Sequence, residues 1–242
     1  MSNAFNKKYS FAGLMVLRIE RKHILTALIL YVIYVALTIY IAINTENIAL
    51  NRYLFFTVFN HRVPTLTPLI TVLSTDDYGR AFFWIPVALI LWFFGGRYRK
   101  ASVIMVSAFV ISLVLGELMK HIMYEPRPFL ILNITPLIHE PADSSYPSGH
   151  ALIVGTGAFS ALVSLPWYIS IPLTIEALLV SYGRVYVGVH WPLDVIAGWI
   201  LGIANTELTL ALPQYQELIY LIMRRLLWWF SYSRSNGLST ND

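Results

Sequence analysis

Long apolar runs recur along the chain, and they restrict its possible folds more than any other feature. The run 24–43 contains no charged residue. An uncharged run of about 20 residues matches the length that an α-helix needs to cross the hydrocarbon core of a bilayer. We therefore predict an all-α, polytopic membrane protein with six transmembrane helices. The five further spans are expected at 81–95, 101–119, 150–165, 169–182 and 192–212.

The composition is that of one membrane domain. Only 12% of the 242 residues are charged, whereas a soluble domain usually carries about 25%. No linker rich in glycine, serine or proline separates the apolar runs, so a single integral membrane domain is expected over residues 1–242. The chain has no cysteine, which excludes disulfides, thiol nucleophiles and cysteine metal sites.

The segments outside the predicted spans differ in character. Residues 44–80 are expected to form an irregular external loop with an interfacial or partly re-entrant patch at 66–73. Five prolines occur in 121–148, and they break helices and stiffen turns. Residues 213–242 are expected to form an amphipathic tail on the membrane surface.

The distribution of basic residues predicts the topology. Lys and Arg cluster before the first run, between the second and third runs, and after the sixth run. Because cytoplasmic loops carry an excess of these residues, both termini are expected in the cytoplasm of a protein of the inner (plasma) membrane. The same bias accounts for the small net charge of +4, and no dense basic face remains to bind nucleic acid.

Three polar clusters adjoin the apolar runs on the predicted extracytoplasmic side. Ionisable residues next to a bilayer are costly, so they are functional candidates by default. The first cluster places Lys120 seven positions before Arg127 and Pro128. Lysine offers a point charge and arginine a planar fork, and both suit phosphate oxygens.

The second cluster is Ser148-Gly149-His150, which follows Pro147 at the start of a predicted helix. Ser148 can cap this helix, and Gly149 allows a ligand to approach the backbone. The free N–H groups of a helix N-terminus attract anions. His150 is therefore expected beside a bound anion.

The third cluster comprises Arg184, His190 and Asp194. Asp194 follows His190 by four positions, so its carboxylate can accept the imidazole N–H and fix the tautomer. The second ring nitrogen of His190 is then free to attack phosphorus.

The order Lys-x6-Arg-Pro, Pro-Ser-Gly-His and Arg-x5-His-x3-Asp resembles the type 2 phosphatidic acid phosphatase superfamily of integral membrane lipid phosphatases. The resemblance covers about 116–212. It implies that His190 forms a phosphohistidine, that Asp194 is its partner, and that His150 protonates the leaving oxygen. It also implies a set of ligands for the phosphoryl oxygens: Lys120, Arg127, Ser148, Gly149 and Arg184.

The resemblance further implies catalysis without a metal ion or other cofactor, with the cations supplying the positive charge. One position departs from the family pattern. The family commonly has serine before the third-motif arginine, whereas this chain has Gly183. One hydroxyl contact to phosphate is therefore expected to be missing or replaced by a backbone N–H.

The predicted activity is hydrolysis of a lipid phosphomonoester or diphosphate at the extracytoplasmic face. Compatible substrates are phosphatidylglycerophosphate, phosphatidic acid, undecaprenyl diphosphate and lipid A phosphates, and substrate selection is expected in 44–80 and 129–146. A lipid phosphotransferase would use the same intermediate. A non-catalytic binder or transporter of anionic lipids is another alternative, but it gives no reason for the two histidines and Asp194. Vanadium haloperoxidase chemistry is a third alternative.

The remaining polar loop residues, including Glu125 and Glu140, are expected to be solvated. Glu125 is also a candidate for contacting the substrate or Arg127, because it lies beside the first motif.

Overall fold

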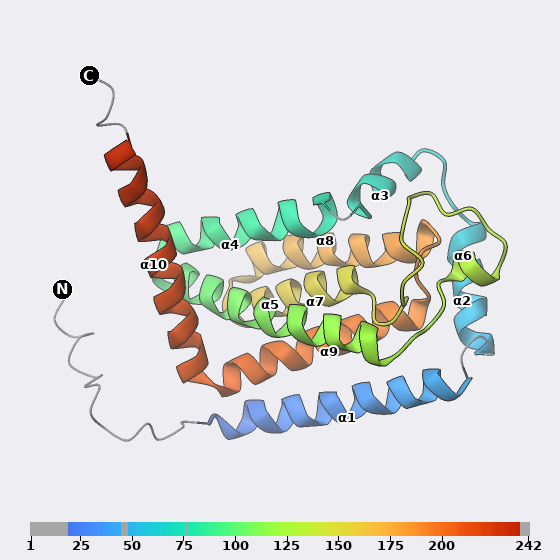
Figure 1. Cartoon of the computed structure of the whole chain (residues 1–242), viewed down its shortest axis with the longest axis horizontal. Coiled ribbons are helices and arrows are strands. Elements are labelled where there is room, and N and C mark those ends of the chain that lie inside the picture. Colours follow the sequence, from blue (N-terminus) through green and yellow to red (C-terminus); the bar gives the residue numbers. More distant parts are fainter. Residues whose placement is uncertain (1–18, 45–47, 76, 238–242) are drawn as a thin grey trace.

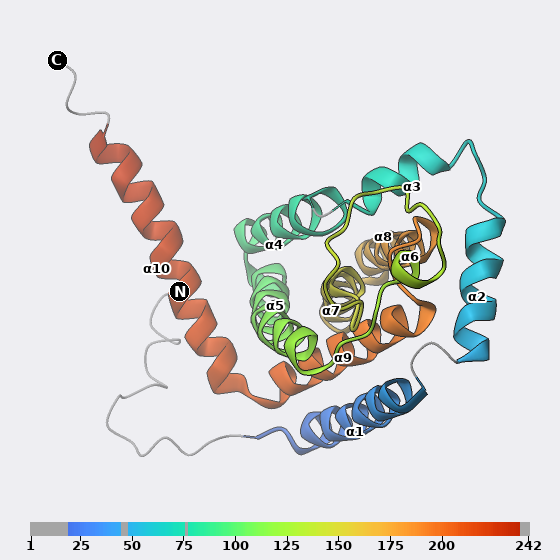
Figure 2. The same ribbon diagram turned by 45° about the vertical axis from the view of Figure 1, so that its right-hand side comes forward.

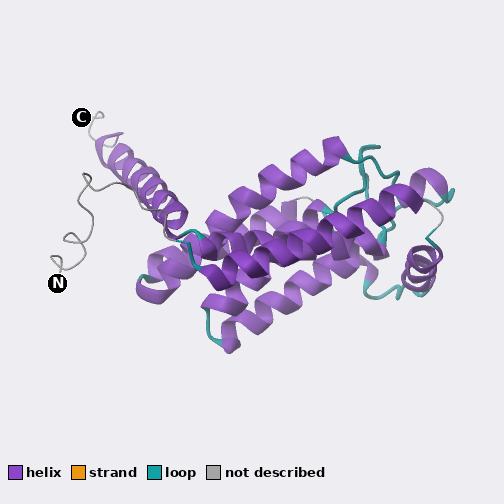
Figure 3. Ribbon diagram, turned by 90° about the horizontal axis from the view of Figure 1, so that it is seen from below, coloured by secondary structure: helices purple, strands orange, loops and turns teal. Residues whose placement is uncertain are grey.

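The computed structural model describes residues 19–44, 48–75 and 77–237. Helices form the regular structure of these residues, and no strand occurs among them (Figure 3). The all-α prediction is therefore confirmed. The longer helices are α1 (Arg21–Asn44), α2 (Ala49–Asn60), α4 (Phe82–Phe94), α5 (Gly96–Ile122), α7 (Gly149–Ser164), α8 (Trp167–Tyr186), α9 (Pro192–Ala211) and α10 (Pro213–Gly237). The shorter ones are α3 (Thr67–Leu73), the π-helix η2 (Asp77–Ala81) and α6 (Pro128–Ile131).

The main body is a bundle in which α1, α4, α5, α7, α8 and α9 run alongside one another (Figure 1). Helix α7 lies at its centre and packs against α5, α8 and α9 (Figure 2). Of the 16 residues of α7, 11 are buried. The neighbouring helices therefore shield α7, while α1 packs mainly on α9 and turns most of its apolar side chains outward.

Several helices suit a membrane environment. Helices α1, α5 and α9 are each long and apolar enough to cross a bilayer, and shorter apolar helices cover Gly79–Phe94 and Gly149–Ser164. Outward-facing Leu25 and Val32 of α1 are 60% and 69% exposed, as a lipid-facing surface requires. All six predicted runs fall almost entirely within helices of the bundle.

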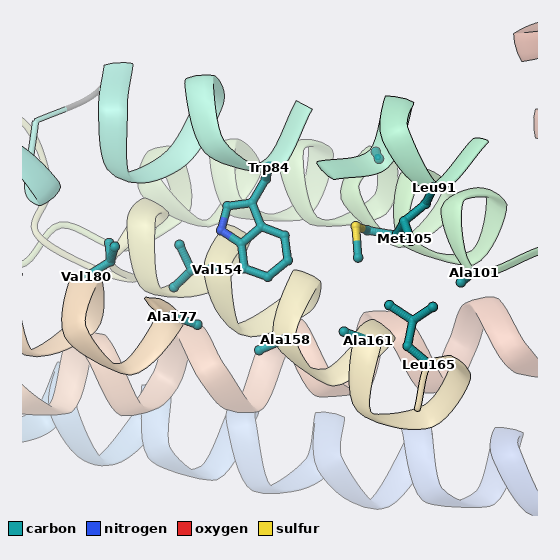
Figure 4. Packing of buried hydrophobic residues seen from close by; sticks show 11 residues of the cluster. Trp84, Leu91, Ala101, Met105, Val154, Ala158, Ala161, Leu165, Ala177 and Val180 are labelled. Carbon is teal, nitrogen blue, oxygen red and sulfur yellow. The ribbon is translucent and has the colours of Figure 1, made fainter. Parts of the chain in front are cut away.

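Small residues allow the central helices to approach closely. A β-carbon added at Gly198 or Gly202 of α9 would lie 2.9 Å from backbone atoms of Leu152 in α7. The ring of Trp84 in α4 packs against α7 at Gly157, where a side chain would collide with it, and lies beside Ala158 (Figure 4). Lipid tails are as apolar as leucine, so close van der Waals packing of this kind is what holds membrane helices together.

The described residues of the segment 44–80 are more ordered than expected. They include α2, which was not predicted, and the apolar patch expected at 66–73 forms α3. Phe55 and Phe59 lie one turn apart on the buried face of α2, and the ring of Phe55 lies 5.3 Å from the ring of Trp191. Packing against the start of α9 thus stabilises a helix that is too short and too mixed in sequence to be recognised as a span.

The two ends of the bundle differ. Helices α2, α3 and α6 lie at one end, and α10 lies at the other, beside the turn between α4 and α5 (Figure 1). Tyr215 of α10 donates a hydrogen bond to the Ser107 carbonyl at 2.9 Å. The basic residues of the α4–α5 turn therefore lie at the opposite end from the sequence motifs.

Candidate active site

The three motifs meet at the end of the bundle that carries α6. Lys120 lies in the last turn of α5, Ser148 caps α7, Arg184 lies in the last turn of α8, and Asp194 lies in the first turn of α9. Two contacts join the motifs directly. Arg127 contacts His190, and the Ser148 backbone N–H donates to the Asp194 carbonyl at 3.2 Å.

His190 lies between an acid and a guanidinium. Its Nδ1 is 3.3 Å from Asp194 Oδ2, and its Nε2 is 3.3 Å from Arg127 Nη1. A guanidinium has only donors, so Nε2 must accept and the ring proton must be on Nδ1, toward Asp194. In this tautomer Nε2 carries the free lone pair of the ring, which here accepts the Arg127 hydrogen bond.

The position of Asp194 follows from the local sequence. Pro192 begins α9, and the Asp194 carboxylate accepts the backbone N–H of Trp191 at 2.8 Å. An acid in this position satisfies one of the free N–H groups of a helix N-terminus. Asp194 Oδ2 also accepts a hydrogen bond from Ser145, whose hydroxyl lies 3.3 Å from His190 Nδ1.

Arg127 is almost completely buried, with 1% of its surface exposed. Its Nε and Nη2 donate to one oxygen of Asp143, at 3.0 and 2.7 Å. Its Nη1 donates to the carbonyl of Val189 at 3.0 Å. These bonds fix the plane of the guanidinium beside His190.

Two acids from the segment before α7 neutralise the predicted phosphate ligands. Glu140 is ion-paired with Arg184, and its other oxygen lies 3.5 Å from Arg127 Nη2. Lys120 Nζ lies 3.1 Å from Asp143. Glu140 is therefore not the solvated loop residue that we expected, because its side chain is only 8% exposed within this cluster.

The second motif begins α7 as predicted. Ser148 is fully buried and accepts the backbone N–H of Ala151 at 3.4 Å. His150 Nε2 lies 3.2 Å from the Thr75 carbonyl. A further cation reaches the same helix end, because Arg80 Nη1 lies 3.6 Å from where a β-carbon of Gly149 would be. Arg80 was not among the predicted site residues, and it precedes the second predicted span by one residue.

The structure gives a steric reason for glycine at position 183. A β-carbon there would collide with the hydroxyl oxygen of Ser74, a fully buried residue at the end of α3. The Ser74 carbonyl accepts a hydrogen bond from Arg184. A hydroxyl from a different segment thus occupies the space beside Arg184 that the family's serine would take.

The environment favours neutral His190. Burial, followed by the charges of Arg127 and Arg184, holds the pKa of His190 well below its usual value. For Asp143, partial burial raises the pKa, but hydrogen bonds from Arg127 and Lys120 outweigh it and the net pKa is lowered. At neutral pH the site thus combines a neutral His190 with a charged Asp143.

Glu125 differs from expectation. It is not the solvated loop residue that we expected. It is 3% exposed, and its carboxyl faces that of Asp194. Ser145 gave no signal in the sequence, because it lies 45 positions before His190 and 49 positions before Asp194.

Comparison with known proteins identifies similar chains. Residues 101–218 match the PAP2 superfamily. An undecaprenyl-diphosphatase from Sulfolobus acidocaldarius is 49% identical over 177 residues, which cover 72% of this chain and 84% of that protein. The crystal structure of LpxE from Aquifex aeolicus matches with a TM-score of 0.62 at 29% identity, covering 68% of this chain and 97% of that one. A PAP2-type phosphatidylglycerolphosphate phosphatase from Bacillus subtilis matches with a TM-score of 0.60 at 25% identity, covering 76% and 94%.

Proposed function

Because this chain belongs to the PAP2 superfamily of membrane lipid phosphatases, we propose that it hydrolyses a polyprenyl diphosphate of the undecaprenyl type through a phosphohistidine at His190. The observation that carries the proposal is the pair of contacts made by the two ring nitrogens of His190. Its Nδ1 faces Asp194, and its Nε2 faces the buried Arg127. The name of the Sulfolobus relative supports the choice of substrate.

The first chemical step transfers the terminal phosphoryl group. His190 Nε2 attacks the terminal phosphorus while the bond from phosphorus to the bridging oxygen breaks. Protonated His150 gives its proton to that oxygen, and the lipid monophosphate leaves. Asp194 stabilises the positive charge that develops on the imidazole.

The second step hydrolyses the phosphohistidine. Water attacks phosphorus, neutral His150 accepts a proton from that water, and the bond between phosphorus and Nε2 breaks. Inorganic phosphate leaves, and His190 is again neutral at Nε2. Lys120, Arg127 and Arg184 neutralise the phosphoryl oxygens throughout, together with the N–H groups at the start of α7.

We propose six spans with both termini in the cytoplasm and the site at the extracytoplasmic face. Helices α1, α4, α5, α7, α8 and α9 supply the spans, and the basic α4–α5 turn lies opposite the site. In this arrangement the prenyl chain stays in the bilayer while its headgroup enters the site. Transfer of that chain into water would cost about 0.8 kcal/mol per methylene.

The test is phosphate release by purified protein from undecaprenyl diphosphate, phosphatidylglycerophosphate, phosphatidic acid and lipid A phosphates, with a chelator present. We expect turnover in the chelator, fastest on undecaprenyl diphosphate. His190→Ala should retain less than roughly a thousandth of this activity. His121→Ala is the matched control, because His121 lies at the end of α5 with its side chain 73% exposed.

Each outcome has a separate meaning. Acid-labile phosphate on the wild type but not on His190→Ala would support the intermediate. Full turnover by His190→Ala would exclude it. A wild type that releases no phosphate from any lipid, but transfers it to an acceptor, would be a phosphotransferase.

A further inference from the structure

Glu125 is a buried acid that the mechanism above does not use. It lies two residues before Arg127, and only 3% of its surface is exposed. Two hydrogen bonds of its backbone groups hold its segment against the residues just before the second motif. Its N–H donates to Ser144 Oγ at 3.2 Å, and its carbonyl accepts the Ser145 N–H at 2.8 Å.

The side chain of Glu125 meets the carboxyl of Asp194. The other Asp194 oxygen, Oδ2, faces the donors Trp191 N–H, Ser145 O–H and His190 Nδ1. Within the described residues, Asp194 Oδ1 and Glu125 Oε2 are buried oxygens that no donor reaches. Two facing carboxylates without a donor would repel each other in a site that excludes water.

Protonation of one of the two carboxylates removes this repulsion. We propose that Glu125 is protonated and donates a hydrogen bond to Asp194, which keeps Asp194 charged and aimed at His190. Glu125 is thus a positioning residue for the nucleophile, and the inference rests on the role proposed above for His190. A protonated carboxyl supplies the donor that Asp194 otherwise lacks on its Oδ1 side.

The surroundings are consistent with this assignment. Burial, followed by the negative charge of Asp194, raises the pKa of Glu125. The other titratable or charged groups around the pair are His190 before α9, Arg127 on the segment of Glu125, and Tyr146 before α7. Arg127 directs its guanidinium to Asp143 and Val189, so its bonds do not neutralise Glu125.

The test compares two substitutions of similar size in the full-length protein. Glu125→Gln keeps a donor at the same place, so its kcat on the preferred lipid should stay within about 3-fold of wild type. Glu125→Leu removes the donor and should lower kcat about 10- to 100-fold, the usual effect of losing a group that orients a reactive side chain. KM should change by less than about 3-fold in both, because the proposed role of Glu125 is to position Asp194 and not to bind phosphate.

A second measurement reports the protonation state even if Glu125→Leu folds poorly. An acid whose pKa is raised in the folded state must take up a proton on folding above its unfolded pKa, so wild-type stability falls as pH rises. Glutamine has no such cost. The thermal midpoint of Glu125→Gln should therefore rise relative to wild type between pH 5 and pH 9.

The outcomes separate this inference from the proposed function. An active wild type with Glu125→Gln as impaired as Glu125→Leu, or with both variants fully active, would overturn the role of Glu125. A constant difference in midpoint across the pH range would overturn its protonation. Failure of the wild type to turn over any lipid would instead overturn the proposed function.

Discussion

Glu140 places a carboxylate between Arg127 and Arg184, where two buried guanidinium groups converge. A phosphate group that binds these arginines must compete with that carboxylate. We therefore expect the acid to weaken anion binding while it stabilises the protein, since loss of one partner of a buried ion pair costs about 3–5 kcal/mol.

Replacing Glu140 with glutamine should separate these two effects. We expect the inhibition constant of inorganic phosphate to fall about 10-fold, a change of 1.4 kcal/mol, and the thermal midpoint to fall as well. Saturating phosphate should recover part of the midpoint, because a ligand stabilises the state that binds it. Glu117→Gln, at a side chain 70% exposed on α5, should change neither value. Weaker inhibition by phosphate would show that Glu140 orients the arginines instead.

For individual residues, the sequence could predict the cations, the histidines and Asp194, but not the acids Glu140 and Asp143 that pair with the cations. Motif spacing identifies Arg184 and His190 because both lie at helix ends with fixed separations. The hydrogen bond from Arg184 to Glu140 spans 44 positions, and that from Ser145 to Asp194 spans 49. Such pairs leave no periodic signal in one sequence, because only the packing of the helices brings them together.

Helices α3 and α8 fit together because the side chain of Ser74 occupies the space that Gly183 leaves empty. Gly183 of α8 leaves room for the hydroxyl of Ser74 at the end of α3. The next residue, Thr75, directs its carbonyl to His150 at 3.2 Å, so α3 also supports the second motif. A shift of α3 would consequently disturb Arg184 and His150 together.

A swap of the hydroxyl between these two helices tests this fit. Gly183→Ser should lower both the thermal midpoint and kcat, the latter about 10-fold, because its side chain collides with Ser74. Ser74→Ala in the Gly183→Ser background should restore most of both losses, with a coupling energy of about 0.5–3 kcal/mol. The measurement is a double-mutant cycle of midpoint and activity over the four proteins. Strictly additive effects would show that the two positions do not interact.

Apolar runs predicted the bundle helices well, because uncharged length is a strong signal for a spanning helix. They missed α2, whose stability comes from the packing of Phe55 against Trp191. They also ended the fifth span at residue 182, whereas α8 continues to Tyr186 and carries Arg184 in its last turn. Hydropathy alone excludes a charged residue at that position, but the buried ion pair with Glu140 stabilises Arg184 there.

The orientation of the whole molecule across the membrane can be measured by labelling. The natural chain has no cysteine, so a single introduced cysteine reports one position. Thr135 is exposed near the site, and Lys100 is exposed near the α4–α5 turn. A membrane-impermeant maleimide should label Thr135→Cys in intact cells and Lys100→Cys only after permeabilisation. The reverse pattern would place the site in the cytoplasm.

Backbone hydrogen bonds at the end of α8 link Arg184 to His190. The N–H groups of Val189 and His190 both donate to the Arg184 carbonyl at 3.2 Å. Arg184 and His190, the proposed phosphate ligand and the proposed nucleophile, are therefore linked through the backbone, and a tilt of α8 would move both together. Parts of the segments 44–80 and 129–146, which we predict to select the substrate, are tied to this unit, because Ser74 and Glu140 bind Arg184 and Ser145 binds Asp194. Only the rest of these two segments can change in sequence without altering the proposed reactive geometry.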